Sequence, residues 1–139
     1  MNVKPMLVWD RPIFPHSPYQ SPFSKSFLMA VKSLNYNKLD KLLALDRFLV
    51  FHYDECRQTG LIWAAKRNHT DMVKYLLQNH SRVNFRDIAG RTALIFATKN
   101  NNIEMSRILL IYHADPTIQT DAGVSAYTLA KTKQNSVLT

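Results

Sequence analysis

The chain has 139 residues, 46% of them hydrophobic and 20% charged, which is the balance of a single globular domain. Its longest apolar stretches, such as residues 108–112, fall far short of the roughly 18 residues that a membrane-spanning helix needs. Lys and Arg outnumber Asp and Glu by 18 to 10, and the net charge of +8 favours an acidic partner (a protein surface, nucleic acid or anionic lipid) without indicating a fold.

Residues 1–23 are predicted to form an extended arm. Prolines at positions 5, 12, 15, 18 and 22 each fix their own φ and push the preceding residue toward extended geometry. The arm also lacks a basic segment followed by an apolar one, so we expect no cleavable targeting signal. Its large rings would be left in water if nothing covered them, so the arm is expected either to dock on a partner or to fold back over the first helices. The anchor residues would be Trp9, Phe14, Tyr19 and Phe23.

A short helix pair is expected from Ser24 onwards. The first helix carries an apolar stripe at the i, i+3, i+4, i+7 spacing, made by Phe27, Ala30, Val31 and Leu34. After an Asn-Tyr-Asn break at residues 35–37, leucines at 39, 42 and 43 predict the second helix. The apolar and aromatic stretch 48–53 is expected to be either a strand-like connection or the end of a lengthened second helix.

From residue 61 the sequence repeats at a fixed period of about 33 residues, which is typical of stacked solenoid repeats. Leu-Ile-Trp-Ala-Ala at 61–65 returns as Leu-Ile-Phe-Ala-Thr at 94–98, and more weakly as Tyr-Thr-Leu-Ala-Lys at 127–131. The pattern therefore predicts a stack of similar layers. Such a stack favours binding of a partner, rather than catalysis, as the function.

Side chains that can accept a hydrogen bond stand where the repeated helices should begin. Helices are expected at 61–66, 71–78 and 92–98. Thr92 and Ser125 are predicted to cap first helices of a layer, and Asp71 to cap a second helix. Trp63 and Phe96 recur at the same place with alanines beside them, so they are predicted to pack between layers.

The repeating unit resembles the ankyrin repeat in Asp-Ile-Ala-Gly-Arg-Thr-Ala-Leu-Ile-Phe-Ala at 87–97, in Leu109-Leu110 and in Ala114-Asp115. Residues 57–84 look like the preceding unit, and the likeness is good over about 54–135 but poor over 24–53. The resemblance implies an all-α solenoid of about three or four stacked helix-turn-helix repeats, the first degenerate and the last truncated.

The chain is accordingly predicted to divide into an arm (1–23), a repeat domain (24–135) and a short tail (136–139). It departs from the family at Gly60, where a proline usually opens the first helix. Asn68 and Asn101 stand where the family usually has a loop glycine, and Asn tolerates a left-handed backbone nearly as well.

Resemblance to the family also implies where a partner would bind, since connecting-loop tips and the exposed edges of first helices form its concave recognition face. The partner-binding residues predicted on this basis are Lys66, Arg67, Arg86, Ile88, Arg91, Lys99, Asn100 and Lys133. The same face would include Glu55, Gln58, Ala89, Gln119, Asp121 and Val124. Basic residues outnumber acidic ones among these positions, so the concave face should be positive.

Enzymatic constellations are missing from the sequence. With only three glycines there is no Gly-rich phosphate loop, and neither a Cys/His zinc spacing nor a carboxylate pair on one element is present. His69 is expected to bridge loop groups, and His80 and His113 to face helix C-termini rather than hold a metal. We therefore predict no catalysis, no cofactor and no metal.

Taken together, the residues and the resemblance predict a non-catalytic protein–protein interaction module or small scaffold subunit of a larger assembly. The basic concave face would bind an acidic protein surface, with the arm as second anchor; acidic cytoskeletal polymers are one candidate class. The alternative is binding of RNA or a ribonucleoprotein through the same face. The argument against this alternative is that no aromatic platform is interleaved with the basic positions. A single cysteine, Cys56, favours a reducing intracellular compartment, cytoplasmic or cytoskeletal, with an organellar complex left open.

Overall fold

A computed structural model describes residues 22–133, and in this range the chain forms seven α-helices, one short 3-10 helix and no strand. The elements are α2 (Ser24–Lys32), α3 (Tyr36–Leu45), η1 (Arg47–Phe51), α4 (Gly60–Lys66), α5 (Thr70–Gln78), α6 (Ala93–Lys99), α7 (Ile103–Ile111) and α8 (Ala126–Lys133). The predicted all-α fold is confirmed for the described residues.

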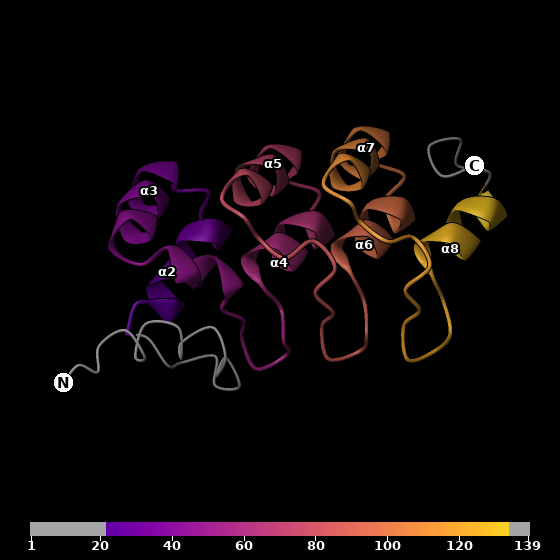
Figure 1. The fold of residues 1–139 in the computed structure, drawn as a ribbon, viewed down its shortest axis with the longest axis horizontal. Helices are drawn as coiled ribbons and strands as arrows, with labels where there is room; N and C mark the ends of the chain where they lie inside the picture. The colour runs from indigo at the N-terminus through magenta and orange to yellow at the C-terminus, as the bar shows by residue number, and fades with distance from the viewer. Residues whose placement is uncertain (1–21, 134–139) are drawn as a thin grey trace.

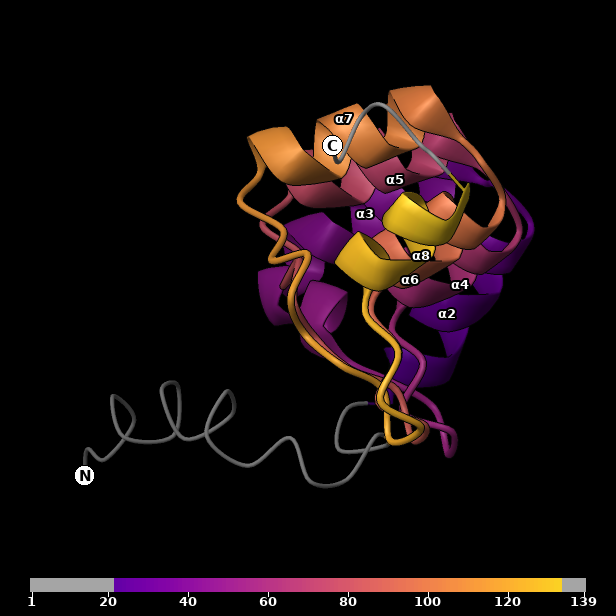
Figure 2. The ribbon, with the colours of Figure 1, turned by 90° about the vertical axis from the view of Figure 1, so that its right-hand side faces the viewer.

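The helices lie in two layers, as Figures 1 and 2 show. Helices α2, α4, α6 and α8 form one layer, which we call the inner layer, and α3, α5 and α7 lie over them as the outer layer. Helices α2, α4 and α6 each contact the outer helix that follows and the next inner helix along the stack. No outer helix follows α8 within residues 22–133, and the predicted all-α solenoid of stacked helix pairs is confirmed.

Helix starts follow the 33-residue pattern. In the inner layer Thr59, Thr92 and Ser125 accept a hydrogen bond from the amide three residues on, at 3.2, 3.3 and 3.2 Å. In the outer layer Asn35 and Asn102 do the same for α3 and α7. The caps predicted at Thr92 and Ser125 are confirmed.

The cap predicted at Asp71 is wrong. Helix α5 begins one residue earlier, at Thr70, and its N-cap His69 makes no side-chain cap hydrogen bond. Asp71 lies instead within the first turn, where its charge is favourable because the helix dipole is positive there.

Helix ends use left-handed residues that are not glycine. Asn68 and Asn101, with φ of 68° and 56°, follow α4 and α6 as predicted, and His80 and His113 follow α5 and α7 with φ of 72° and 71°. At each of these ends, two amide-to-carbonyl bonds close the last turn; after α4 they run from the Asn68 amide to Ala65 and from the His69 amide to Ala64. The chain therefore turns sharply from the inner to the outer layer without glycine.

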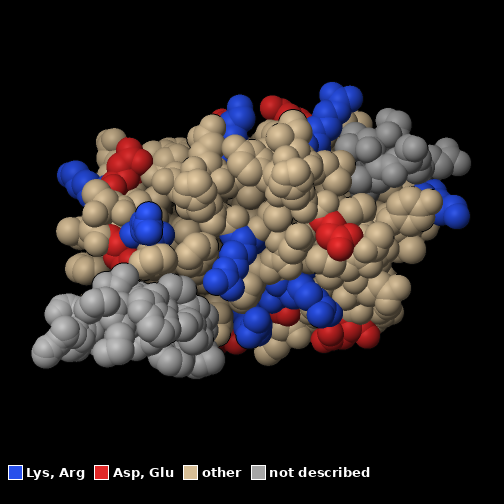
Figure 3. Space-filling model, viewed as in Figure 1, with Lys and Arg blue, Asp and Glu red and all other residues tan. Residues whose placement is uncertain are grey.

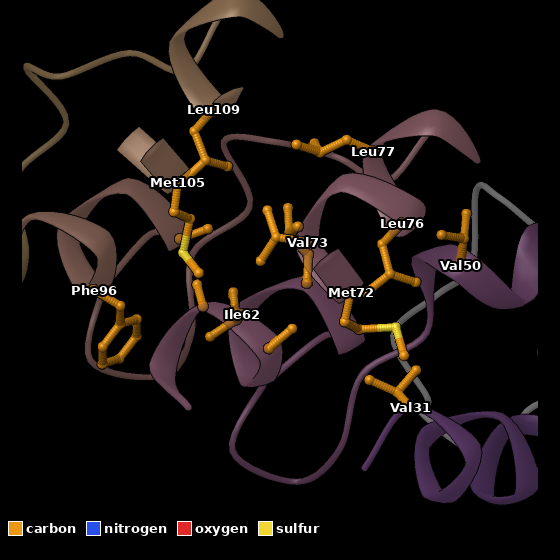
Figure 4. Close-up of a cluster of buried hydrophobic side chains, with 14 of the residues drawn as sticks. Val31, Val50, Ile62, Met72, Val73, Leu76, Leu77, Phe96, Met105 and Leu109 are labelled. Carbon is orange, nitrogen blue, oxygen red and sulfur yellow. The ribbon is translucent and has the colours of Figure 1, made fainter. Parts of the chain in front are cut away.

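The core lies between the two layers and between successive repeats (Figure 4). Leu76, Met72 and Val31 pack between the first and second pairs, and Met105 and Ile62 between the second and third. Phe96 is 5% exposed, which confirms its predicted packing position. Trp63 is only half-buried, because its ring lies beside the Asn68 turn and stacks on His69 with a centroid distance of 5.5 Å.

Residues 48–51 match neither of the two expectations, whereas Tyr53 is strand-like, since it pairs with Thr59 in an isolated antiparallel bridge. Asp46 is extended, with φ of −153°, so it ends α3 rather than lengthening it. Its side chain then accepts a hydrogen bond from the Phe48 amide at 3.0 Å and starts the 3-10 helix η1. A carboxylate that caps the next turn is the physical reason why α3 stops here.

Candidate partner-binding surface

Three hairpins that project from the inner layer are built in the same way (Figure 1). Each starts with a side chain that accepts two backbone amides of its own turn: Asp54 from Cys56 and Gln58, Asp87 from Ala89 and Arg91, Thr120 from Ala122 and Val124. The fourth residue of each turn has a left-handed backbone. It is glycine in the second and third hairpins, Gly90 and Gly123, but Arg57 in the first.

Neighbouring hairpins are tied together by their backbones. The Ile88 amide donates to the Cys56 carbonyl, and the Asp121 amide donates to the Ala89 carbonyl, each at 3.0 Å. Arg86 adds a side-chain link, since its guanidinium donates to the Gln119 carbonyl at 2.9 Å and lies 3.6 Å from the Asp121 carboxylate. The hairpins consequently form one continuous surface.

A hollow of about 380 Å³ lies between the second and third hairpins and helices α6 and α8. Its lining residues are Ala89, Arg91, Ile95, Lys99, Thr120, Asp121, Ala122, Val124 and Leu129. Five predicted concave positions, including Arg91 and Lys99, are thus brought into one site. Ile95, Thr120, Ala122 and Leu129 were not predicted to be there. For Ile95 the reason is that α6 is apolar and buried over nearly its whole length, so its sequence does not separate a core position from a hollow-lining one.

Arg91 holds one wall of the hollow in a fixed position. Its Nε donates to Asp87 Oδ2 at 2.8 Å, and its guanidinium lies 4.9 Å from the centroid of the Phe96 ring. The Asp87 side chain is fully buried in this pair. Arg91 therefore both lines the hollow and satisfies a buried carboxylate.

Three lysines form a row at the carboxyl ends of the inner helices: Lys66 on α4, Lys99 on α6 and Lys133 on α8. The Lys133 ammonium donates to the Lys99 carbonyl at 2.8 Å, so the row follows the stack. All three side chains are exposed, and none forms an ion pair within residues 22–133. Cations at this position are favoured because the helix dipole is negative at the C-terminus.

The remaining predicted residues lie around this site. Ile88 is at the tip of the second hairpin and 63% exposed, so it offers an apolar contact. Arg67 and Asn100 are the C-caps of α4 and α6, and the Asn100 amide group donates to the Ala65 carbonyl at 3.3 Å. The Arg86 guanidinium donates to the Gly90 and Gln119 carbonyls, so this residue links the second and third hairpins as well as carrying charge.

Two of the predicted basic residues lie against aromatic rings of the inner helices. Arg67 lies 5.8 Å from the Trp63 ring and Arg91 lies 4.9 Å from the Phe96 ring. Arg67 and Trp63 are four residues apart on α4 and therefore share one face of the helix. Both rings are nevertheless packed within the protein to a large extent, so they fix the cations more than they offer an open stacking platform.

Of the four predicted arm anchors, Trp9, Phe14 and Tyr19 fall outside the described residues. Phe23 is described; it lies directly before α2 and is 39% exposed. Helix α2, which Phe23 precedes, lies at the opposite end of the stack from α8 (Figure 1).

Titratable groups with shifted pKa values lie away from the hollow. Burial, then the hydrogen bond and charge of Asp40, raises the pKa of Tyr75 in the outer layer. Hydrogen bonds from the Thr117 side chain and backbone lower the pKa of Asp115. Within residues 22–133 no group of three His, Cys, Asp or Glu side chains is placed to hold a metal ion, and no helix is long and apolar enough to cross a membrane.

A family model described as ankyrin repeats, three copies, matches residues 27–120, which is more than half of the chain. The chain belongs to the ankyrin-repeat family. The match begins inside α2, so the first helix pair, which the sequence relates only poorly to the family, is part of the ankyrin stack. Ankyrin repeats generally act as non-catalytic protein–protein interaction modules. No curated protein matches the chain in a sequence comparison.

Proposed function

We propose that this ankyrin-repeat protein binds an acidic, partly apolar segment of another protein in the hollow between its second and third hairpins. The observation that carries the proposal is that Arg91 and Lys99 stand on the walls of a hollow whose other lining is largely apolar. Apolar side chains of the partner would enter the hollow, and carboxylates of the partner would pair with these two cations.

The lysine row extends the same positive charge along the stack. Lys66 and Lys133 lie on the helices that flank α6, so a segment running across the inner layer would meet one ammonium group per repeat. Long-range attraction of this kind raises the association rate and orients the partner, and salt screens it.

A protein partner suits the hollow better than nucleic acid does. The Asp121 side chain lines the hollow and is 70% exposed, and the charge of Arg91 is largely matched by Asp87. A phosphate backbone would meet this exposed carboxylate at close range, whereas a protein segment can place a neutral or basic residue beside it.

The arm is proposed as a second anchor within an intracellular assembly. Two linked contacts raise overall affinity through effective concentration, even when each is weak. Deleting residues 1–21 should therefore weaken association with the native partner without changing the thermal unfolding of residues 22–133.

The test measures binding of the full chain to two labelled probes by fluorescence anisotropy: a peptide of alternating glutamates and leucines, and an RNA of equal length. A triple variant, Lys66→Gln, Lys99→Gln and Lys133→Gln, should bind the peptide about tenfold more weakly, the sum of three modest ion pairs. The matched control is Lys38→Gln, Lys41→Gln and Lys74→Gln, which removes the same charge from exposed positions on the outer helices.

Equal weakening by the two triple variants would overturn the proposal, because only net charge would then matter. Tighter binding of the RNA than of the peptide, with log affinity falling by about 0.7 per decade of salt for each phosphate contacted, would replace the proposal with its nucleic-acid alternative.

A further inference from the structure

A second group of cations lies on the connections that follow α3 and α5 and on the first hairpin, outside the predicted concave positions. Arg47 lies 5.3 Å from the Phe48 ring, and Arg82 lies 4.8 Å from the Phe51 ring. Arg57 lies 5.1 Å from the Tyr53 ring and 4.9 Å from the Phe85 ring. We call these three arginines, with their four rings, the arginine surface.

The rings hold the arginines in place and are themselves held by the fold. The Tyr53 and Phe85 rings stack with a centroid distance of 5.4 Å. Tyr53 precedes the first hairpin and Phe85 the second, so this stack joins successive repeats. Phe48 and Phe51 lie 6.1 Å apart on η1. The arginine surface therefore joins η1 and two successive connections, and its geometry depends on the stacking of the repeats.

The three guanidinium groups find no hydrogen-bond acceptor among the residues that the structure describes. Arg47, Arg57 and Arg82 are all exposed, and none has a hydrogen bond or an ion pair to another residue in the range 22–133. By contrast, the nearby carboxylate of Asp54 accepts two amides of its own hairpin. A guanidinium stacked on a ring presents a planar fork that matches a carboxylate, and its orientation is already fixed.

A hollow of about 230 Å³ adjoins these cations. It is lined by the apolar side chains of Phe48, Val50 and Phe51 and by Arg47, Asn79 and His80. The connections that carry the arginine surface cross the near side of the molecule in Figure 1, and in the same view Figure 3 shows Lys and Arg side chains gathered over the hairpins beside α4 and α6.

We infer that the arginine surface is a second binding site, for a partner protein segment in which carboxylates flank one aromatic or large aliphatic side chain. The carboxylates pair with Arg57 and Arg82, and the apolar side chain occupies the hollow beside Arg47. Nucleic acid fits less well, since the ring faces that could stack on bases are already covered by guanidinium groups or packed inside. The partner segment is expected to be acidic because the surface carries three arginines, and to carry one large apolar side chain because one small hollow adjoins them.

The experiment uses the full chain labelled with ¹⁵N and three probes: the peptide acetyl-EEDFDEE-amide, the same peptide with serine in place of phenylalanine, and a uridine heptanucleotide. The phenylalanine peptide should shift the Nε–Hε signals of Arg47, Arg57 and Arg82, and should bind several-fold more tightly than the serine peptide. Arg57→Gln and Arg82→Gln should each weaken binding about two- to fivefold, as partly exposed ion pairs do.

Two further variants separate a specific surface from general charge. Arg107→Gln removes an exposed arginine on α7, outside the arginine surface, and should leave peptide binding unchanged. Arg82→Lys keeps the charge but loses the planar fork, so it should weaken binding as much as Arg82→Gln does. The inference is overturned if the three arginine signals do not move, if the serine peptide binds equally well, if Arg107→Gln weakens binding to the same extent, or if the RNA binds more tightly than the peptides.

Discussion

The first and second hairpins share one backbone design but carry their arginines one position apart. In the first hairpin the arginine is Arg57, on the left-handed residue of the turn; in the second it is Arg91, one place later, and the left-handed residue is Gly90. Arg57 turns onto Tyr53 and Phe85, whereas Arg91 turns onto Asp87 and Phe96. A shift of a single position within equivalent turns therefore assigns the charge to two different surfaces.

The two arginines also differ in what holds them. Arg91 is fixed by a buried carboxylate, so the second hairpin and the wall of its hollow depend on one ion pair. Arg57 is fixed by ring faces alone and has no carboxylate partner among the described residues. The hollow between the second and third hairpins therefore depends on an ion pair that also stabilises the fold. The arginine surface has no such pair, so we expect that it can be altered with little effect on the stability of the fold.

The largest effect is expected from Asp87→Ala in the second hairpin. The change leaves the Ala89 and Arg91 amides and the Arg91 guanidinium without their acceptor, and should lower the free energy of unfolding by about 2–4 kcal/mol. Urea denaturation followed by circular dichroism measures the loss. Asp87→Asn keeps an acceptor for the two amides and should lose less; an equal loss would show that the amide bonds contribute nothing.

The equivalent change in the first hairpin, Asp54→Ala, should cost less. Asp54 accepts two amides, has no arginine partner within residues 22–133 and is only half-buried, so we expect a loss of about 1–2 kcal/mol in the same measurement. A loss as large as that of Asp87→Ala would contradict the distinction between the two hairpins.

Thr120→Ala extends the comparison to the third hairpin. Its hydroxyl accepts the Ala122 and Val124 amides at 3.2 Å each, and a neutral acceptor with long bonds should contribute about 0.5–1 kcal/mol. Thr120→Ser retains the hydroxyl and serves as the control. If both variants unfold at the same urea concentration, the hydroxyl is not what stabilises the turn.

The smallest effect on stability is expected from Arg57→Gly. Glycine relieves the left-handed strain at a φ of 58°, which stabilises the fold by about 1 kcal/mol. It also increases the entropy of the unfolded chain and removes the contacts with the two rings, and these two losses together offset the gain. The free energy of unfolding should thus change by less than about 0.5 kcal/mol. Binding of the phenylalanine peptide should fall nonetheless, and retained affinity would show that Arg57 is not part of the arginine surface.

What the sequence predicts well here is what repeats within one unit. The 33-residue period, the hydroxyl caps at Thr92 and Ser125, and the left-handed asparagines at Asn68 and Asn101 all follow from local geometry that recurs in every layer. The start of α5 at Thr70 was missed because a histidine without a side-chain cap precedes it.

Contacts that cross between repeats could not be predicted in the same way. Tyr53 and Phe85 belong to different units, and no periodic pattern shows that their rings stack or that Arg57 covers both. Gly60 is a similar case: the sequence shows only that glycine stands where the family usually has proline, whereas in the fold a Cβ at this position would lie 3.1 Å from Val31 Cγ2 of the neighbouring helix. The close approach of α2 and α4 is the physical reason for a small residue there.

Zero-length carbodiimide cross-linking of the native complex tests the central claim most directly, because the reagent joins a lysine only to a carboxylate in contact with it. The account predicts that Lys66, Lys99 and Lys133 link to Asp or Glu residues of another protein, and that Lys38, Lys41 and Lys74 of the outer helices do not. Links confined to the outer-helix lysines, with the row at the inner-helix ends left unmodified, would contradict it.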